Sequence, residues 1–149
     1  MANIVLNIAL GYVKRYAEQV GTGNAALIVV PIETSGLESD AVLRDKADLA
    51  AFLVGTTNEQ TTMGRKTVTA CTVTVDNTND RVAIDIADQT WTGATGNAIS
   101  KLLICFDNDT TSGTDANIVP MTLHDFAITP DGSDVTATIS DFYRATSAA

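Results

Sequence analysis

The 149-residue sequence predicts a mainly β fold: a single-domain antiparallel β-sandwich or barrel with one short α-helix. Three observations support this prediction. Threonine occurs 22 times, in runs where it alternates with Val, Ile and Ala, and β-branched side chains favour strands. Clusters of Asn, Asp, Gly and Pro, which favour turns, separate these runs. With 45% hydrophobic residues the chain can fill one core without a disulfide or a metal, and its strand pattern leaves sandwich and barrel both open.

The first 20 residues fit either a strand or a helix. Alternating apolar residues indicate a strand, and these are Ile4, Leu6, Ile8, Leu10 and Tyr12. A second set has roughly the spacing of one helix face, namely Val5, Ile8, Tyr12, Tyr16 and Val20. Gly11, in the middle, favours the extended structure. Residues 1–20 are therefore a possible N-terminal arm that makes contacts between subunits.

Two further elements are predicted before residue 60. Residues 25–32 (AALIVVPI) have the composition of a buried strand. Residues 45–54 (DKADLAAFLV) contain helix-forming residues, begin at Asp45, which can cap a helix, and are followed by Gly55. The short α-helix is expected there.

Residues 66–75 (KTVTACTVTV) and 81–88 (RVAIDIAD) have the period-two alternation of strands. Between them, residues 76–80 (DNTND) are typical of a turn, because Asn and Asp side chains bond their own backbone. These three segments predict a β-hairpin.

The last third of the chain predicts a central strand and a second hairpin. Residues 102–106 (LLICF) form a continuous apolar run, as expected of a strand buried on both faces. Residues 118–129 resume a strand pattern, but Pro120 cannot donate to a ladder, so this strand begins after the proline or lies at an edge. The turn PDG at residues 130–132 then leads into 134–139, whose alternation predicts the partner strand.

The charge distribution argues against nucleic-acid and membrane partners. The net charge is −9; residues 76–149 contain eleven Asp and three basic residues, whereas residues 1–75 contain seven acidic and six basic residues. An acidic surface without a basic patch repels phosphate backbones. No basic residue precedes the short N-terminal apolar run, which Asn7 interrupts, so neither a signal peptide nor a membrane span is expected. The acidic C-terminal half is expected to face solvent, and the N-terminal half to make protein contacts.

No enzymatic activity, cofactor or metal site is expected. The single histidine, His124, lies in an alternating segment without a nucleophile turn such as GxSxG, so we interpret it as a strand residue. The Asp-rich segments 76–80 and 107–117 offer oxygen ligands but lack the Glu that closes an EF-hand loop, and their composition is typical of turns. Cys71 and Cys105 belong to no CxxC or Cys/His cluster; they are interpreted as buried apolar residues, and a disulfide between them stays open.

Four motifs follow one another from Asn79 onward: NDRVAIDIADQTWTG, KLLICFDND, IVPMTLHDF and PDGSD. They contain a D-x-T-W step at residues 88–91, an aromatic-Asp pair at Phe106-Asp107 and an Asp-Phe pair at Asp125-Phe126. This order resembles a group of small structural proteins of tailed bacteriophages. The opening MANIVLNIALGYVKRYAEQV and the segment GNAALIVVPIETSGLESDAVLRDKADLAAFLVG are also similar to that group, so the resemblance covers most of the chain.

The resemblance implies a non-enzymatic virion protein, a head decoration (cement) protein that is made in the bacterial host cytoplasm and binds the outer capsid surface. Its implied partners are the major capsid protein and copies of itself, in a homotrimer. The alternative is a tail, neck or fibre component with a receptor- or glycan-binding role.

Six residues are candidates for protein contacts: Ile4, Leu6, Ile8, Leu10, Tyr12 and Trp91. The first five belong to the N-terminal arm, which we expect to add a strand to the sheet of a neighbouring subunit. Trp91 fits either the core or a pocket on a partner, because an indole supplies a large apolar area and one polar group.

Overall fold

The computed structural model describes residues 3–147, which form ten β-strands, three short α-helices and two 3-10 helices. The strands are β1 (Ile4–Val5), β2 (Ala26–Glu33), β3 (Lys66–Val68), β4 (Thr72–Asp76), β5 (Arg81–Asp85), β6 (Gln89–Trp91), β7 (Ile99–Asp107), β8 (Val119–Ile128), β9 (Val135–Ala137) and β10 (Tyr143–Thr146). The helices are α1 (Val13–Gln19), α2 (Asp40–Leu43) and α3 (Leu49–Phe52), with the 3-10 helices η1 (Asn7–Ala9) and η2 (Asp115–Asn117). The prediction of a mainly β fold is confirmed.

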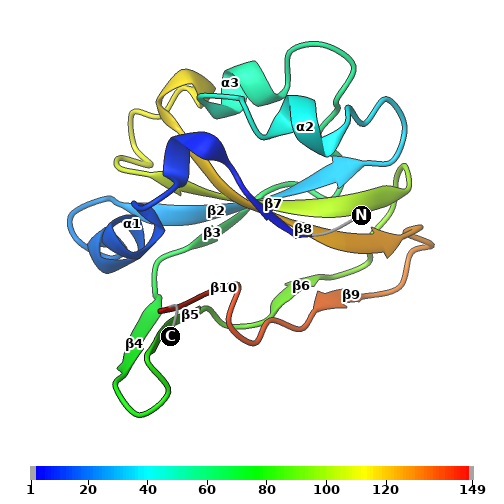
Figure 1. Cartoon of the computed structure of the whole chain (residues 1–149). Helices are drawn as coiled ribbons and strands as arrows, with labels where there is room; N and C mark the ends of the chain where they lie inside the picture. The colour runs from blue at the N-terminus through cyan, green and yellow to red at the C-terminus, as the bar shows by residue number, and fades with distance from the viewer. Residues whose placement is uncertain (1–2, 148–149) are drawn as a thin grey trace.

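The strands form two layers (Figure 1). An antiparallel five-stranded sheet, in the order β1-β8-β7-β2-β3, crosses the middle of the molecule, with α2 and α3 over one face. Below its other face lie the three-stranded sheet β10-β5-β4 and the two-stranded ribbon β6-β9. Within residues 3–147 the large sheet keeps two edges, β1 and β3, and does not close. The architecture is therefore sandwich-like and not a barrel.

The central strand of the large sheet is β7, as predicted. Its side chains enter two cores: Leu102, Ile104 and Phe106 pack between the two layers of strands. Leu103 and Cys105 pack under α2 and α3. Successive side chains of a strand point to opposite faces, so an uninterrupted apolar run fills both cores. The predicted buried strand is β2, which lies beside β7 and is buried in the same way.

The predicted first hairpin forms from β4 and β5. In its turn, the carboxylate of Asp76 accepts hydrogen bonds from the backbone N–H groups of Thr78 and Asn79. Residues 66–75 are not one strand, however, because β3 pairs with β2 in the large sheet and the chain then crosses to the other layer before β4 begins. An alternating sequence indicates which side chains share a face, but it does not select the neighbouring strand.

The predicted second hairpin, residues 118–129 with 134–139, does not form. β8 pairs with β7 and β1, whereas β9 pairs with β6. The turn at residues 130–132 is present, but the N–H of Gly132 donates to the carbonyl of Ala94 at 2.7 Å, so the turn contacts the segment after β6. Turn residues predict a change of direction without selecting the partner strand.

Pro120 lies inside β8, which begins at Val119 and is flanked by β1 and β7. The prediction that this strand begins after the proline or lies at an edge is wrong. Pro120 lies opposite Cys105, where the register between β7 and β8 shifts, and β1 pairs only with Thr122 and Leu123. A proline is tolerated at such an irregularity because no ladder hydrogen bond requires its missing N–H.

The N-terminal 20 residues are extended only at β1 and helical afterwards. After β1 come η1 and then α1, which buries Val13 and Ala17. Gly11 has a φ of +79°, in the left-handed region that favours glycine, and it separates η1 from α1. The extended interpretation is therefore wrong after Val5, and the helical spacing is correct from Val13 on.

The predicted helix at residues 45–54 is shorter and starts later. It is α3, and Asp48 caps it by accepting the backbone N–H of Ala51 at 2.7 Å. Asp45 instead accepts a hydrogen bond from the side chain of Asn7 at 2.6 Å. Both aspartates suit a cap, and tertiary contacts decide between them. Residues 3–147 contain three short α-helices where the sequence predicts one, and none of them is long and apolar enough to span a membrane.

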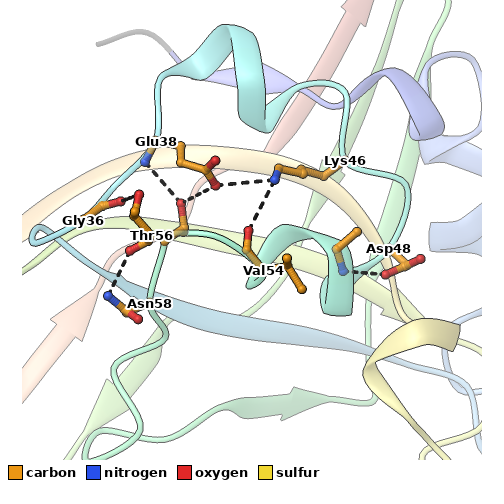
Figure 2. A network of polar contacts seen from close by, with 9 residues as sticks. Gly36, Glu38, Lys46, Asp48, Val54, Thr56 and Asn58 are labelled. Atoms are coloured by element: carbon orange, nitrogen blue, oxygen red, sulfur yellow. Dashed lines mark hydrogen bonds and ion pairs between the residues drawn. The ribbon is translucent and has the colours of Figure 1, made fainter.

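A network of polar contacts joins the two ends of the segment that carries α2 and α3 (Figure 2). The ammonium of Lys46 lies 3.4 Å from the Glu38 carboxylate, which accepts a hydrogen bond from the hydroxyl of Thr57 at 3.0 Å. Thr57 is buried, and the hydroxyl of its neighbour Thr56 donates to the carbonyl of Gly36 at 2.6 Å. These contacts hold the segment closed over the large sheet.

Both cysteines are free thiols. Cys105 is fully buried in β7, whereas Cys71, just before β4, is half-buried against the core. Burial raises the pKa of the Cys71 thiol to about 11, and it raises the pKa of Cys105 as well. The interpretation as a buried apolar residue is confirmed for Cys105.

Candidate protein-contact surface

The structure divides the predicted contact residues into exposed and buried ones. Ile8, Leu10 and Tyr12 are between 43% and 58% exposed, on η1 and on the turn into α1. Leu6 and Trp91 have at most 2% of their surface exposed. Neither side chain can touch a partner in this conformation. The predicted set of contact residues is therefore corrected, because Leu6 and Trp91 are core residues.

Hydrogen bonds explain why Leu6 and Trp91 are inside. The N–H of Leu6 donates to the carbonyl of Met121 at 2.9 Å, and its side chain packs in the core under α2 and α3. The indole N–H of Trp91 donates to the carbonyl of Gly64 at 2.9 Å, and the Lys66 ammonium lies 5.6 Å from the ring centre. The polar group of the indole is therefore satisfied within the protein, and Trp91 is a core residue.

The N-terminal segment completes the sheet of its own chain. In β1, Ile4 lies opposite Leu123 of β8 and Val5 lies opposite Thr122. Ile4 is half-buried there. From residue 3 on, the expected arm is part of the fold, and the side chains that remain available to a partner are those of η1 and the turn after it.

Sequence reasoning misses two exposed apolar residues, Val42 in α2 and Val54 after α3, which are 45% and 66% exposed. They belong to the segment beside η1, since the N–H of Asn7 donates to the carbonyl of Arg44, the residue after α2, at 2.9 Å. The sequence does not predict α2, so it gives no indication that Val42 points away from the core. We call the following five residues the helix-side surface: Ile8, Leu10, Tyr12, Val42 and Val54.

Two arginines add positive charge to the segments that carry the helix-side surface. Arg15 in α1 and Arg44 after α2 are both exposed, and neither forms an ion pair within residues 3–147. Their neighbour Lys14, by contrast, pairs with Glu18 one helical turn later. Exposed apolar side chains together with arginine are the composition enriched in protein interfaces.

The acidic C-terminal half of the chain contributes to both layers, because it forms nearly all of the second layer and also supplies β7 and β8. In the large sheet, β7 and β8 lie between β1 on one side and β2 and β3 on the other. The loop at residues 107–117 leads directly to Ile118, whose carbonyl accepts the N–H of Leu49 in α3 at 2.9 Å. The division of the sequence by charge is therefore not a division of the surface.

His124 lies beside a small hollow of about 210 Å³, between β8 and residues 137–142. Its Nε2 is 2.8 Å from the hydroxyl of Thr122, which is 2% exposed and does not line this hollow. Burial lowers the pKa of His124 to about 4, so the ring is neutral at physiological pH. Within the described chain no carboxylate accepts a hydrogen bond from its second nitrogen, which is the contact that orients a catalytic base.

The Asp-rich turns use their carboxylates within the turn. Asp109 accepts hydrogen bonds from the side chains of Thr111 and Ser112 at 2.6 and 2.8 Å, and these bonds lower the pKa of Asp109 to about 2. Asp107 accepts the N–H of Asp109 in the same loop at 3.0 Å. Among residues 3–147, His, Cys, Asp and Glu side chains form no group of three that could hold a metal ion.

Comparisons of the chain with models of protein families, with curated proteins and with solved structures find no match.

Proposed function

We propose that this chain is a non-enzymatic structural protein of a tailed-phage virion, a head decoration protein that binds the major capsid protein on the outer surface of the capsid. The observation that carries the proposal is the helix-side surface. Its five large apolar side chains are between 43% and 66% exposed. Ile8, Leu10 and Tyr12 lie on η1 and the turn into α1, and Val42 and Val54 lie on the segment that Asn7 joins to η1. Exposed apolar side chains on linked segments of a folded domain are typical of a surface that another protein covers.

The segments that carry this surface are already ordered. The Asp48 cap fixes the start of α3, and the bond from the Asn7 side chain to Asp45 fixes η1. The contact of Lys46 with Glu38 joins the residues that follow α2 to those that precede it (Figure 2). A preordered surface loses little conformational entropy on binding. Affinity is then available from a modest apolar area.

The composition of the surface indicates the chemistry of its partner. Arg15 and Arg44 are free to pair with carboxylates at the rim of an apolar patch, so the complementary surface is apolar at its centre and acidic at its edge. Weak contacts of this kind add up when several copies bind together, and the homotrimer implied by the resemblance would supply that multivalency.

The test is the location of the chain in the virion. Particles of the phage that encodes it are purified and separated into heads and tails, and the chain is quantified in each fraction by mass spectrometry. A decoration protein is expected in the head fraction in many copies. Recovery in the tail fraction would favour the alternative of a tail, neck or fibre component, and absence from the particles would reject both.

A further inference from the structure

A groove beside α1 forms a second surface, and none of the residues that line it belongs to the helix-side surface. The groove has a volume of about 550 Å³ and lies between α1 and the segment that runs from the end of β7 to the start of β8. Grooves of this size are within the usual range of sites for small ligands. The side chains that line it are aromatic, amide, hydroxyl and carboxylate groups.

One wall of the groove is aromatic and rigid. The ring of Tyr16 stacks on the ring of Phe106, with 4.9 Å between centroids and 20° between planes. The ring centroid of Tyr12 lies 6.1 Å from that of Tyr16. Phe106 is buried in β7, so the half-buried Tyr16 is held in one position against the sheet.

The opposite side of the groove offers hydrogen-bonding groups that are not used by the protein. The side-chain amides of Gln19, Asn108 and Asn117 make no hydrogen bond within residues 3–147. Each amide presents both donors and an acceptor, which matches the hydroxyl groups of a sugar. Asp109 also lines the groove, but its two carboxylate oxygens already accept hydrogen bonds from Thr111 and Ser112.

The charge of the groove selects against anionic ligands. Among the described residues that line it there is neither Lys nor Arg, and Asp109, with a pKa of about 2, is ionised throughout the physiological range. A phosphate or carboxylate ligand would be repelled there. The groove therefore suits a neutral ligand with many hydroxyl groups and one apolar face.

We propose that this groove binds a neutral oligosaccharide, with the apolar face of one sugar ring against Tyr16 and its hydroxyl groups bonded to the amides of Asn108 and Asn117. This goes beyond the proposed role in the capsid and does not depend on it, because a different surface is involved. The ligand class follows from one aromatic wall, three unpartnered amides and the absence of a lining cation in the described part of the groove.

The test is saturation-transfer NMR on the full chain with three neutral probes, maltotetraose, cellotetraose and tetra-N-acetylchitotetraose, and with sialyllactose as the anionic comparison. The informative variant is Asn108→Ala/Asn117→Ala, since both residues are exposed and make no side-chain hydrogen bond in the described structure. The matched control is Asn77→Ala, an equally exposed asparagine in the turn between β4 and β5.

The expected result is saturation transfer to at least one neutral tetrasaccharide. The double substitution should raise the Kd for that sugar about tenfold or more, since two lost hydrogen bonds have about that effect. Asn77→Ala should leave the Kd unchanged. The proposal is overturned if none of the three neutral probes receives saturation, if the double variant binds as the wild type does, or if sialyllactose binds more tightly. Failure here leaves the location of the chain in the virion untouched, so the two proposals fail separately.

Discussion

The ring of Tyr16 in α1 stacks on the ring of Phe106 in β7, with 4.9 Å between their centroids. This contact joins the N-terminal helix to the central strand of the large sheet, although 90 residues of sequence separate the two rings. The ring centroid of Tyr12, a residue of the helix-side surface one turn earlier, lies 6.1 Å from that of Tyr16. One helix therefore supports both the proposed protein contact and the proposed sugar groove.

Replacing Tyr16 by Ala is expected to lower the free energy of unfolding by about 2 kcal/mol, because the change removes a half-buried ring and its stacking contact with Phe106. The matched control is Tyr12→Ala, which removes a largely exposed ring and is expected to cost less than about 0.5 kcal/mol. Urea unfolding of the two variants measures the difference. Equal costs would show that the stack does not anchor α1.

Stability is expected to fall between pH 7 and pH 5 because of His124. Burial lowers the pKa of His124 in the folded chain to about 4, from about 6.5 in the unfolded chain. The unfolded state therefore binds more protons in this window, so stability is full above pH 6.5 and decreases as the pH falls. The expected loss from pH 7 to pH 5 is about 2 kcal/mol.

The variant His124→Gln isolates this effect. It has no group that titrates at this position, so the free energy of unfolding should change by about 2 kcal/mol less over the same window. The aspartates of lowered pKa act below pH 5 and do not interfere. A wild-type curve that matches the His124→Gln curve between pH 7 and pH 5 would contradict the assignment.

Lys101 is a charged residue without exposed surface. Its ammonium lies 2.7 Å from Oδ1 of Asp125 and 3.3 Å from Oδ1 of Asp40, and the ammonium lowers the pKa of Asp125 through a hydrogen bond. The variant Asp125→Ala should lower the free energy of unfolding by about 3 kcal/mol, because it removes the nearest partner of a buried charge. The double variant Asp125→Ala/Lys101→Met should recover part of that loss, since no ammonium is then left inside.

Urea unfolding of Asp125→Ala, of Lys101→Met and of the double variant completes this double-mutant cycle. Losses that simply add would show that Lys101 and Asp125 do not depend on each other.

Trp91 is the only tryptophan of the chain, so its fluorescence reports on the core directly. Because Trp91 is 2% exposed, iodide is expected to quench the native protein weakly and the urea-unfolded protein strongly. Strong quenching of the native protein would show that Trp91 is exposed, and Trp91 would again be a candidate contact residue.

The sequence predicts those elements whose signals are local. The length of the apolar run at residues 102–106 favours a strand buried on both faces over a helix, and the turn at 76–80 joins two strands that are neighbours in sequence. The partner of β9 depends on contacts far apart in sequence, and the strong turn at residues 130–132 is compatible with either neighbour. For the same reason an alternating sequence does not predict that the chain leaves the large sheet after β3 and joins the three-stranded sheet at β4.

The contact surface is predicted in part for a similar reason. In a strand, Leu6 and Ile8 would share one face, but η1 changes the period from two to three between them. Leu6 and Ala9 then point inward, whereas Ile8 and Leu10 remain exposed. The residue types in this segment therefore identify the region of contact, and only the backbone shows which of them a partner can reach.

If the helix-side surface attaches the chain to the capsid, substitutions on this surface should weaken the attachment. Point substitutions test it better than removal of the N-terminus, because Leu6 belongs to the core. Suitable variants are Ile8→Ser/Leu10→Ser and, as the control, Val75→Ser, which changes a residue 57% exposed on β4, away from this surface.

The decisive measurement is the number of copies bound per particle when purified protein is added to phage particles that lack it. Wild type and Val75→Ser should bind alike, and Ile8→Ser/Leu10→Ser should need at least about tenfold more protein for the same occupancy, as expected when apolar contacts at the centre of an interface are lost. Wild-type occupancy by the double variant would contradict attachment through the helix-side surface.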